Sequence, residues 1–155
     1  MKKDIRKAGI ILGVGLGGFV DGIVLHQLLQ AHSMLSAKLP QDVLVNVKVS
    51  MIWDGFFHLF TWIYTTWGIV LLFRAVKKHR ETPGRMVVGY CLFGWGLFNV
   101  VEGLLDHVVF NLHHVIEAYG QSWADYAFLA FGLLLCIAGW KYASMGAKTG
   151  VVKLV

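Results

Sequence analysis

Four long apolar stretches dominate the chain, at about residues 8–29, 51–76, 86–112 and 123–143. Each is long enough to cross a hydrocarbon core as a helix, which takes roughly 20 residues. Apolar and polar residues do not alternate at every second position in them, which favours helices over the strands of a membrane barrel. The sequence therefore predicts an all-α integral membrane protein, a four-helix bundle forming a single transmembrane domain over residues 1–155.

The segment between the first two stretches, residues 31–50, is less regular. Valines occur at every second position from Val43 to Val49, which is a weak strand-like pattern following Pro40. A short extended cap and a surface helix are both consistent with it.

Composition agrees with a membrane protein, because 57% of the residues are hydrophobic and only 15% are charged. The formal net charge of +5 raises the question of a nucleic-acid partner. The basic residues, however, cluster between apolar stretches and not along one face, so no nucleic acid is expected. Cys91 and Cys136 both lie within apolar stretches and no Cys-x-x-Cys pair is present, which argues against a disulfide framework or a thiolate metal site.

Lysines and arginines predict the orientation. They concentrate before the first stretch, between the second and third, and after the fourth, whereas the other two loops hold few. Basic loops usually face the cytoplasm, so both termini are expected there, in a multi-pass protein of the inner (cytoplasmic) membrane. A signal peptide is an alternative for the N-terminus, but Asp21 and His26 interrupt its apolar part and no Ala-x-Ala site follows.

Ten acidic or histidine residues lie in or just beyond the first three stretches, near the end of each stretch that is predicted to face outward. With a rise of about 1.5 Å per residue, those inside the stretches fall in the outer half of the membrane. Ionisable groups in a bilayer are costly and usually mark a functional site. The ten residues are Asp21, His26, His32, Asp54, His58, Glu102, Asp106, His107, His113 and His114.

Several of these residues share helix faces. Asp54 and His58 are four positions apart and are therefore neighbours on one helix. Glu102 and Asp106 fall with Asn99 within about 60° of arc. In the first stretch, Asp21 and His26 differ by about 140° in a regular α-helix, so they are expected to reach the bundle interior only from its flanks.

Inward-facing carboxylates and histidines are how helical bundles build di-iron and di-manganese sites. Imidazole also suits zinc and copper, so we predict a transition metal ion, copper, iron or zinc. The predicted metal ligands are His26, His58, Glu102, Asp106 and His107. Three further residues are expected to hold ligands in place or to substitute for them, namely Asp21, Asp54 and Asn99. Three histidines are expected to form a rim around the opening of the site: His32, His113 and His114.

Such a site would serve either metal handling or metal-dependent redox chemistry, and three other interpretations remain open. A neutral hydrogen-bonded network could fix helix register without any ligand. A chain of acids and histidines could conduct protons or transport cations. Haem could bind between two histidines such as His58 and His107, although adjacent acids suit an ion better.

Three motifs together resemble an uncharacterised family of bacterial predicted membrane proteins. The resemblance covers about residues 9–139 and implies a four-span inner-membrane protein of unassigned activity, with a homo-oligomer or a respiratory-complex assembly partner as its expected association. The family tends to have paired histidines where this chain has His32-Ser33 and His107-Val108, which favours one ion over two. The motifs are Asp21-Gly22-x-x-Leu25-His26-Gln27, Trp53-Asp54-Gly55-Phe56-Phe57-His58 and Asn99-x-x-Glu102-Gly103-Leu104-x-Asp106-His107.

Overall fold

The computed structural model describes residues 1–79 and 81–146, and these contain helices and loops but no β-strand. Lys148, Lys153 and Arg80, which contribute to the predicted orientation, lie outside the described residues. The long helices are α1 (Lys2–Asp21), α2 (Leu44–Lys78), α3 (Gly84–Glu102) and α4 (Trp123–Gly146). Two π-helices continue α1 and α3, namely η1 (Gly22–Leu28) and η2 (Gly103–Val109), and a short 3₁₀ turn, η3 (Glu117–Tyr119), precedes α4.

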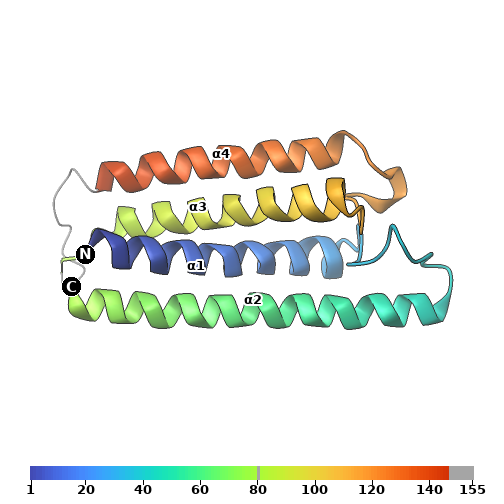
Figure 1. Ribbon diagram of the computed structural model, residues 1–155, viewed down its shortest axis with the longest axis horizontal. Coiled ribbons are helices and arrows are strands. Elements are labelled where there is room, and N and C mark those ends of the chain that lie inside the picture. Colours follow the sequence, from blue (N-terminus) through green and yellow to red (C-terminus); the bar gives the residue numbers. More distant parts are fainter. Residues whose placement is uncertain (80, 147–155) are drawn as a thin grey trace.

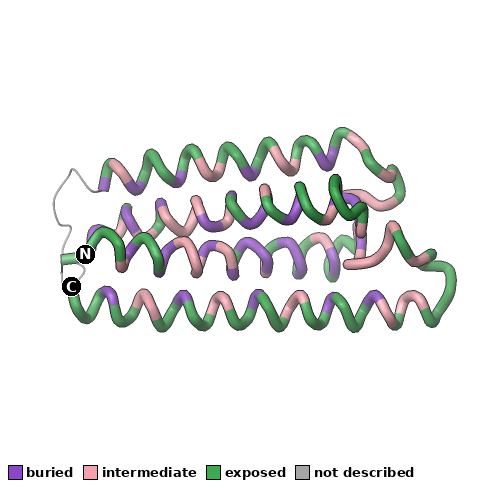
Figure 2. Tube along the Cα trace, viewed as in Figure 1, coloured by how far each residue is buried: buried purple, intermediate pink, exposed green. Residues whose placement is uncertain are grey.

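The helices lie roughly parallel and antiparallel in the order α2, α1, α3, α4 (Figure 1). The helices α1 and α3 run in the same direction at the centre, while α2 packs along α1 and α4 packs along α3. Four helical segments are long and apolar enough to cross a membrane. Buried residues gather on α1 and α3, whereas α2 and α4 are largely exposed (Figure 2), as expected for apolar surfaces that face lipid. The prediction of an all-α, four-span protein is confirmed.

Glycines allow the two central helices to approach each other closely. A Cβ atom at Gly13 would lie 2.0 Å from the Cys91 carbonyl oxygen, and one at Gly94 would lie 2.2 Å from the Ile10 carbonyl oxygen. Backbone atoms cannot rotate away as a side chain can. The contact between α1 and α3 is therefore a contact of backbones, of the kind that small residues permit in membranes.

These two contacts are one contact seen from opposite sides. Gly94 follows Gly13 by the same interval that separates Cys91 from Ile10, which is 81 positions. Reciprocal contacts of this kind are the mark of a two-fold arrangement. The α1–α2 hairpin and the α3–α4 hairpin are therefore equivalent halves, related by a pseudo-two-fold axis that runs along the helices.

The outer helices repeat the same relationship. Gly68 of α2 packs on the backbone of Leu12 in α1, and Gly139 of α4 packs on the backbone of Phe93 in α3. Phe93 again follows Leu12 by 81 positions, while Gly139 follows Gly68 by 71. The shorter interval between α2 and α4 shows that the second half has the shorter loop. The structure thus reveals an internal duplication of the helical hairpin.

Several helix boundaries differ from the predicted ones. The helix α1 begins at Lys2 and not at Ala8, and α2 begins at Leu44 and not at Met51. The valine-rich segment before Met51 is therefore mostly helix, so the extended cap is wrong and the helix alternative is correct. The third helix ends at Val109, earlier than residue 112, because Asn111 turns the chain with a φ of 50°.

Candidate metal centre

Each π-helix brings an acid and a histidine together. The side chains five positions apart are Asp21 with His26 and Glu102 with His107. A π-helix makes i→i+5 hydrogen bonds, so residues at this spacing lie one above the other. His26 Nε2 lies 3.1 Å from Asp21 Oδ2, and His107 Nε2 lies 3.4 Å from Glu102 Oε1. The expectation that Asp21 and His26 meet the interior only from its flanks is wrong, because it assumed α-helical geometry.

Left-handed residues then turn the chain back toward the centre. Gln30 has a φ of 47° and Asn111 a φ of 50°, and these equivalent positions follow η1 and η2. Non-glycine residues are uncommon in this region, although asparagine tolerates it well. Two positions after each of them, His32 and His113 are 5% and 0% exposed. Their rings stack at 4.5 Å between centroids, with only 9° between their planes.

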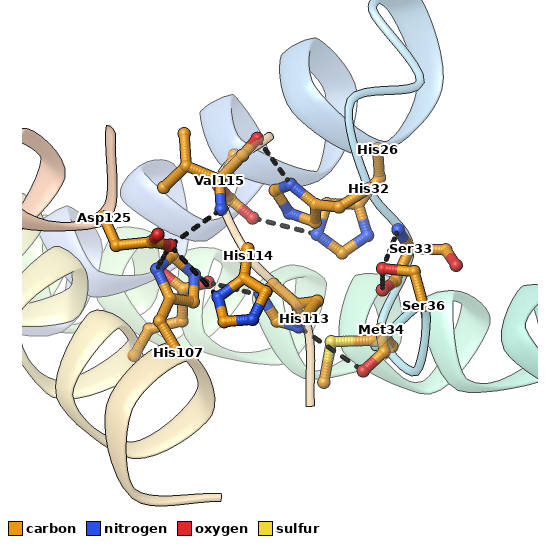
Figure 3. A network of polar contacts seen from close by, with 12 residues as sticks. His26, His32, Ser33, Met34, Ser36, His107, His113, His114, Val115 and Asp125 are labelled. Carbon is orange, nitrogen blue, oxygen red and sulfur yellow. Dashed lines mark hydrogen bonds and ion pairs between the residues drawn. The ribbon is translucent and has the colours of Figure 1, made fainter. Parts of the chain in front are cut away.

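The imidazole rings of His26, His32, His107 and His113 form one cluster (Figure 3). The ring of His26 lies 4.4 Å from that of His32, and the ring of His107 lies 4.8 Å from that of His113. Each half of the duplication thus contributes an outer histidine (His26 or His107) and a central histidine (His32 or His113). We call this set, together with Asp21 and Glu102, the His/acid cluster.

Two further carboxylates hold the outer histidines. His26 Nδ1–H donates to Asp54 Oδ1 over 3.0 Å, and His107 Nδ1 lies 3.1 Å from Asp125 Oδ1. The same two oxygens accept backbone N–H groups at equivalent positions of the two loops, Met34 (2.8 Å) and Val115 (3.0 Å). A carboxylate on Nδ1 fixes the tautomer of a histidine and leaves Nε2 as the ligand atom.

The central histidines are held by the loop of the opposite half. His32 Nδ1–H donates to the Val115 carbonyl over 3.1 Å, and His113 Nδ1–H donates to the Met34 carbonyl over 3.4 Å (Figure 3). Burial, together with the neighbouring His113 and His26, lowers the pKa of His32 to about 2. The imidazole of His32 is therefore neutral, which is the form that binds a metal ion.

Several polar side-chain atoms of the cluster are buried and have no hydrogen-bond partner among the described residues. The contacts between acids and histidines are short, yet many are not aligned as hydrogen bonds. An unsatisfied buried polar group costs about 1–3 kcal/mol. A metal ion would satisfy several of these groups at once. The atoms are Asp21 Oδ1 and Oδ2, Glu102 Oε2, His26 Nε2, His32 Nε2, and both ring nitrogens of His107.

Two sets of three residues place their ligand atoms within 4.8 Å of one another, which is close enough to share one ion. One set is His26, His32 and His113, and the other is Glu102, His107 and His113. The cluster therefore includes three of the predicted ligands, His26, Glu102 and His107. It also includes two histidines that the sequence placed on the rim.

The three histidines predicted to form a rim are buried in the structure. His32 and His113 lie at the centre of the cluster, and His114 is 5% exposed with its Nδ1 3.6 Å from Asp125 Oδ1. Helical spacing could not place these residues, because the left-handed turns at Gln30 and Asn111 redirect the chain.

The other two predicted ligands lie outside both sets. His58 Nδ1–H donates to the Asp54 carbonyl of its own helix over 2.7 Å. The side chain of Asp106 has no hydrogen bond or ion pair among the described residues, and it lines a pocket between α2 and α3. The π-turn explains its position, since it aligns His107 with Glu102 where an α-helix would align Asp106. Asn99 is 2% exposed and lines a small pocket beside Asp21.

Asp125 is the residue that the sequence analysis missed. It lies in the first turn of α4, is fully buried, and accepts hydrogen bonds from the backbone N–H groups of Ser122 and Val115. The signal that could have found it is the repeat itself, in which an acid-Gly pair is followed by histidines at the same intervals. Once Glu102 is matched to Asp21, Asp125 is the natural counterpart of Asp54.

A cavity of about 520 Å³ leads from the cluster toward the surface. His26, His32 and Asp54 line its inner part, and the exposed Gln27 and Gln41 line its outer part. The hydroxyl groups of Ser36 and Ser50, with the carboxylate of Glu117, add polar lining between them. The cavity could therefore pass a small hydrated solute.

The fold and this site together define a class of protein: a four-span helical membrane protein with a buried His/acid cluster near one end. The chain matches the family described as "Predicted membrane protein (DUF2243)" over residues 8–145, and it belongs to that family. The family resemblance stated from the motifs is thereby confirmed. No curated protein and no solved structure matches the chain.

Proposed function

We propose that the protein binds a transition metal ion (copper, iron or zinc) in the His/acid cluster and serves metal handling at the outer side of the inner membrane. The observation that carries the proposal is the set of buried side-chain atoms of the cluster that make no hydrogen bond among the described residues. A network that only fixed helix register would pair its donors with its acceptors. Imidazole and carboxylate together suit divalent transition metals, whereas the carboxylates beside His26, His107 and His113 are a poor environment for a porphyrin.

The distribution of charge supports the outer location. Lys77, Lys78 and Arg85 lie at the end of the bundle where α2 ends and α3 begins, and the cluster lies at the opposite end (Figure 1). Basic residues favour the cytoplasmic side. The cluster and its cavity would then open to the outside, where an ion could enter or leave.

A route through the whole membrane has less support. At the basic end, Ile5 and Met86 are fully buried and pack with Ala75 into an apolar core. The halfway level of the bundle is closed by the backbone contact at Gly13. Binding and exchange at the outer side therefore fit the packing better than conduction.

The decisive experiment measures metal by elemental analysis of protein purified in detergent and incubated with Zn²⁺, Cu²⁺ or Fe²⁺. His113 belongs to both sets of ligand atoms, so His113→Ala is expected to lower the bound metal by half or more. The control is His79→Ala, because His79 contacts Asp4 at the basic end, 2.9 Å away, and should keep the wild-type content. Wild-type protein that binds none of the three metals would overturn the proposal.

A second variant distinguishes the ligand set seen in the structure from the set predicted by helical spacing. His58→Ala is expected to retain the wild-type metal content, because its Nδ1–H is engaged by the Asp54 carbonyl and its ring joins neither ligand set. The same elemental analysis measures it. Loss of metal in this variant, with the helical circular dichroism signal intact, would restore His58 as a ligand.

Metal-dependent redox chemistry is a second candidate, favoured by one further cavity. A pocket of about 360 Å³ lies between α2 and α3, is lined by Phe57, Phe60 and Phe98, and reaches Glu102 and Asp106. An apolar pocket that ends beside the cluster is the feature expected of a substrate site. A metal-loaded protein with a reversible one-electron signal would favour this role, and one that only releases its ion to a chelator would favour handling.

A further inference from the structure

We infer that the cluster holds two metal ions, one in each half of the internal duplication. The inference rests on the proposed function, because it concerns the number and placement of ions in the same cluster. Three features of the cluster support it: the equivalent ligands of the two halves, the position of His113 between them, and the charge of the buried carboxylates.

Each half supplies the same kinds of ligand in the same order. The first half offers Asp21, the outer His26 and the central His32. The second half offers their equivalents, 81 positions later, which are Glu102, His107 and His113. A structure that binds an ion in one half has the donors to bind another in the other half.

The supports of these ligands are also duplicated. Asp54 and Asp125 hold the outer histidines, and the Val115 and Met34 carbonyls hold the central ones. Even the apolar wall is repeated, since Phe57 lies 5.4 Å from the ring of His26 and Phe128 lies 5.4 Å from the ring of His107. The equivalence therefore extends from the ligands to the groups around them.

His113 decides how the ligands are divided. Its ring belongs to both sets of three, but its Nδ1–H is engaged by Met34, so it has one nitrogen to offer one ion. That nitrogen lies 3.1 Å from Glu102 Oε1, which assigns it to the second half. The first half then keeps His26 and His32 of its set, and Asp21 is the further donor available to it, because Asp21 Oδ2 lies 3.1 Å from His26 Nε2 and makes no hydrogen bond among the described residues.

Charge balance points to the same number. Four carboxylates lie at the cluster or directly on its outer histidines, and each is at most 6% exposed: Asp21, Asp54, Glu102 and Asp125. When ionised they carry four negative charges, which two divalent ions and four neutral histidines would balance. With all four histidines neutral, a single divalent ion would leave two of these negative charges without a counter-charge, which is costly in a membrane.

This arrangement does not need the two further histidines that the family resemblance implies. Ser33 and Val108 occupy those positions, and Val108 is 42% exposed. All four histidines of the cluster are present in this chain. The sequence-based expectation of one ion depends on the number of histidines in the motifs. That number does not tell which histidines lie in the cluster.

The test is the stoichiometry of Zn²⁺ bound per chain. Protein purified in detergent is stripped with a chelator, loaded with Zn²⁺, desalted and measured by elemental analysis. We expect two ions per chain in the wild-type protein, one in His26→Ala, one in His107→Ala, and none in the double variant. His79→Ala, at the basic end, is the matched histidine control and should retain two.

The outcomes separate the two proposals. One ion in the wild-type protein, lost entirely in either single variant, would overturn the two-ion inference and leave the metal site standing. No ion in the wild-type protein would overturn the proposed function and the inference with it. Circular dichroism confirms that each variant is folded before its content is compared.

Electron paramagnetic resonance of the Cu²⁺-loaded wild-type protein gives a second reading that does not depend on the variants. Two Cu²⁺ ions in neighbouring half-sites are expected to give a spin-coupled signal, and partial loading should give the signal of isolated Cu²⁺. A fully loaded protein with only isolated Cu²⁺ at one ion per chain would contradict the inference.

Discussion

Gly13→Ala is expected to destabilise the bundle by about 1–3 kcal/mol, the usual cost of forcing an extra group into a packed interior. The new Cβ atom would lie 2.0 Å from the Cys91 carbonyl oxygen and 2.9 Å from the Trp95 backbone nitrogen. Both neighbours are backbone atoms, so α1 and α3 must separate to accommodate the methyl group. Gly94→Ala should cost a similar amount, because the pseudo-two-fold axis places it against the Ile10 carbonyl in the same way.

Gly55→Ala is the matched control. Gly55 lies within α2, and a Cβ atom there would meet nothing within 4 Å. Alanine in an exposed helix is favoured over glycine by up to about 1 kcal/mol, so stability should stay the same or rise. The measurement is the midpoint of chemical unfolding in detergent, followed by circular dichroism. Equal midpoints for Gly13→Ala and Gly55→Ala would contradict the close backbone contact.

The same contact sets the geometry of the cluster. Asp21 and Glu102 lie at the last residues of α1 and α3, beyond the glycines that hold these helices together. A separation of the helices would therefore carry the two halves of the cluster apart. This links the small residues of the bundle interior to the His/acid cluster at one end of the bundle.

The four spans could be predicted from the sequence because lipid imposes a simple rule of length and apolarity. Part of the cluster could be predicted for a related reason. Acids and histidines are costly in a bilayer, so His26, Glu102 and His107 stand out at any helical periodicity. The presence of ionisable residues within apolar stretches is thus enough to predict that these residues are buried.

The arrangement of the ligands could not be predicted in the same way. An α-helix with 3.6 residues per turn would align Glu102 with Asp106 on one face. The π-helix η2 aligns Glu102 with His107 instead. Nothing in the apolar pattern distinguishes a π-turn from an α-turn over seven residues. The error is confined to the two segments where the hydrogen-bond register changes.

The loops presented a different difficulty. His32 and His113 lie beyond the helices, and their positions depend on the left-handed Gln30 and Asn111. Neither residue is a glycine, so the usual sequence signal for a positive φ is absent. A comparison of the two halves would have helped, because matched histidines after matched acid-Gly pairs indicate a shared, specific geometry.

Asp125→Asn is expected to lower the affinity for Zn²⁺ about 10- to 100-fold, the usual effect of losing a carboxylate that supports a metal-binding histidine. Asp125 Oδ1 lies 3.1 Å from His107 Nδ1, and the negative charge makes His107 a stronger ligand through Nε2. Asparagine keeps an oxygen to accept the backbone N–H of Val115, so the loop should remain in place. A loss of affinity in a folded protein would therefore report on the charge and not on the loop.

The duplication supplies the comparison that makes this prediction strict. Asp54→Asn should lower the affinity by a similar factor, because Asp54 supports His26 as Asp125 supports His107. Asp42→Asn, in the exposed loop before α2, removes the same charge away from the cluster and should have no effect. The measurement is competition for Zn²⁺ with a chelator of known affinity. If Asp125→Asn and Asp42→Asn bind Zn²⁺ equally well, the buried carboxylates do not support a metal, and their pairing with histidines must serve the packing of the helices alone.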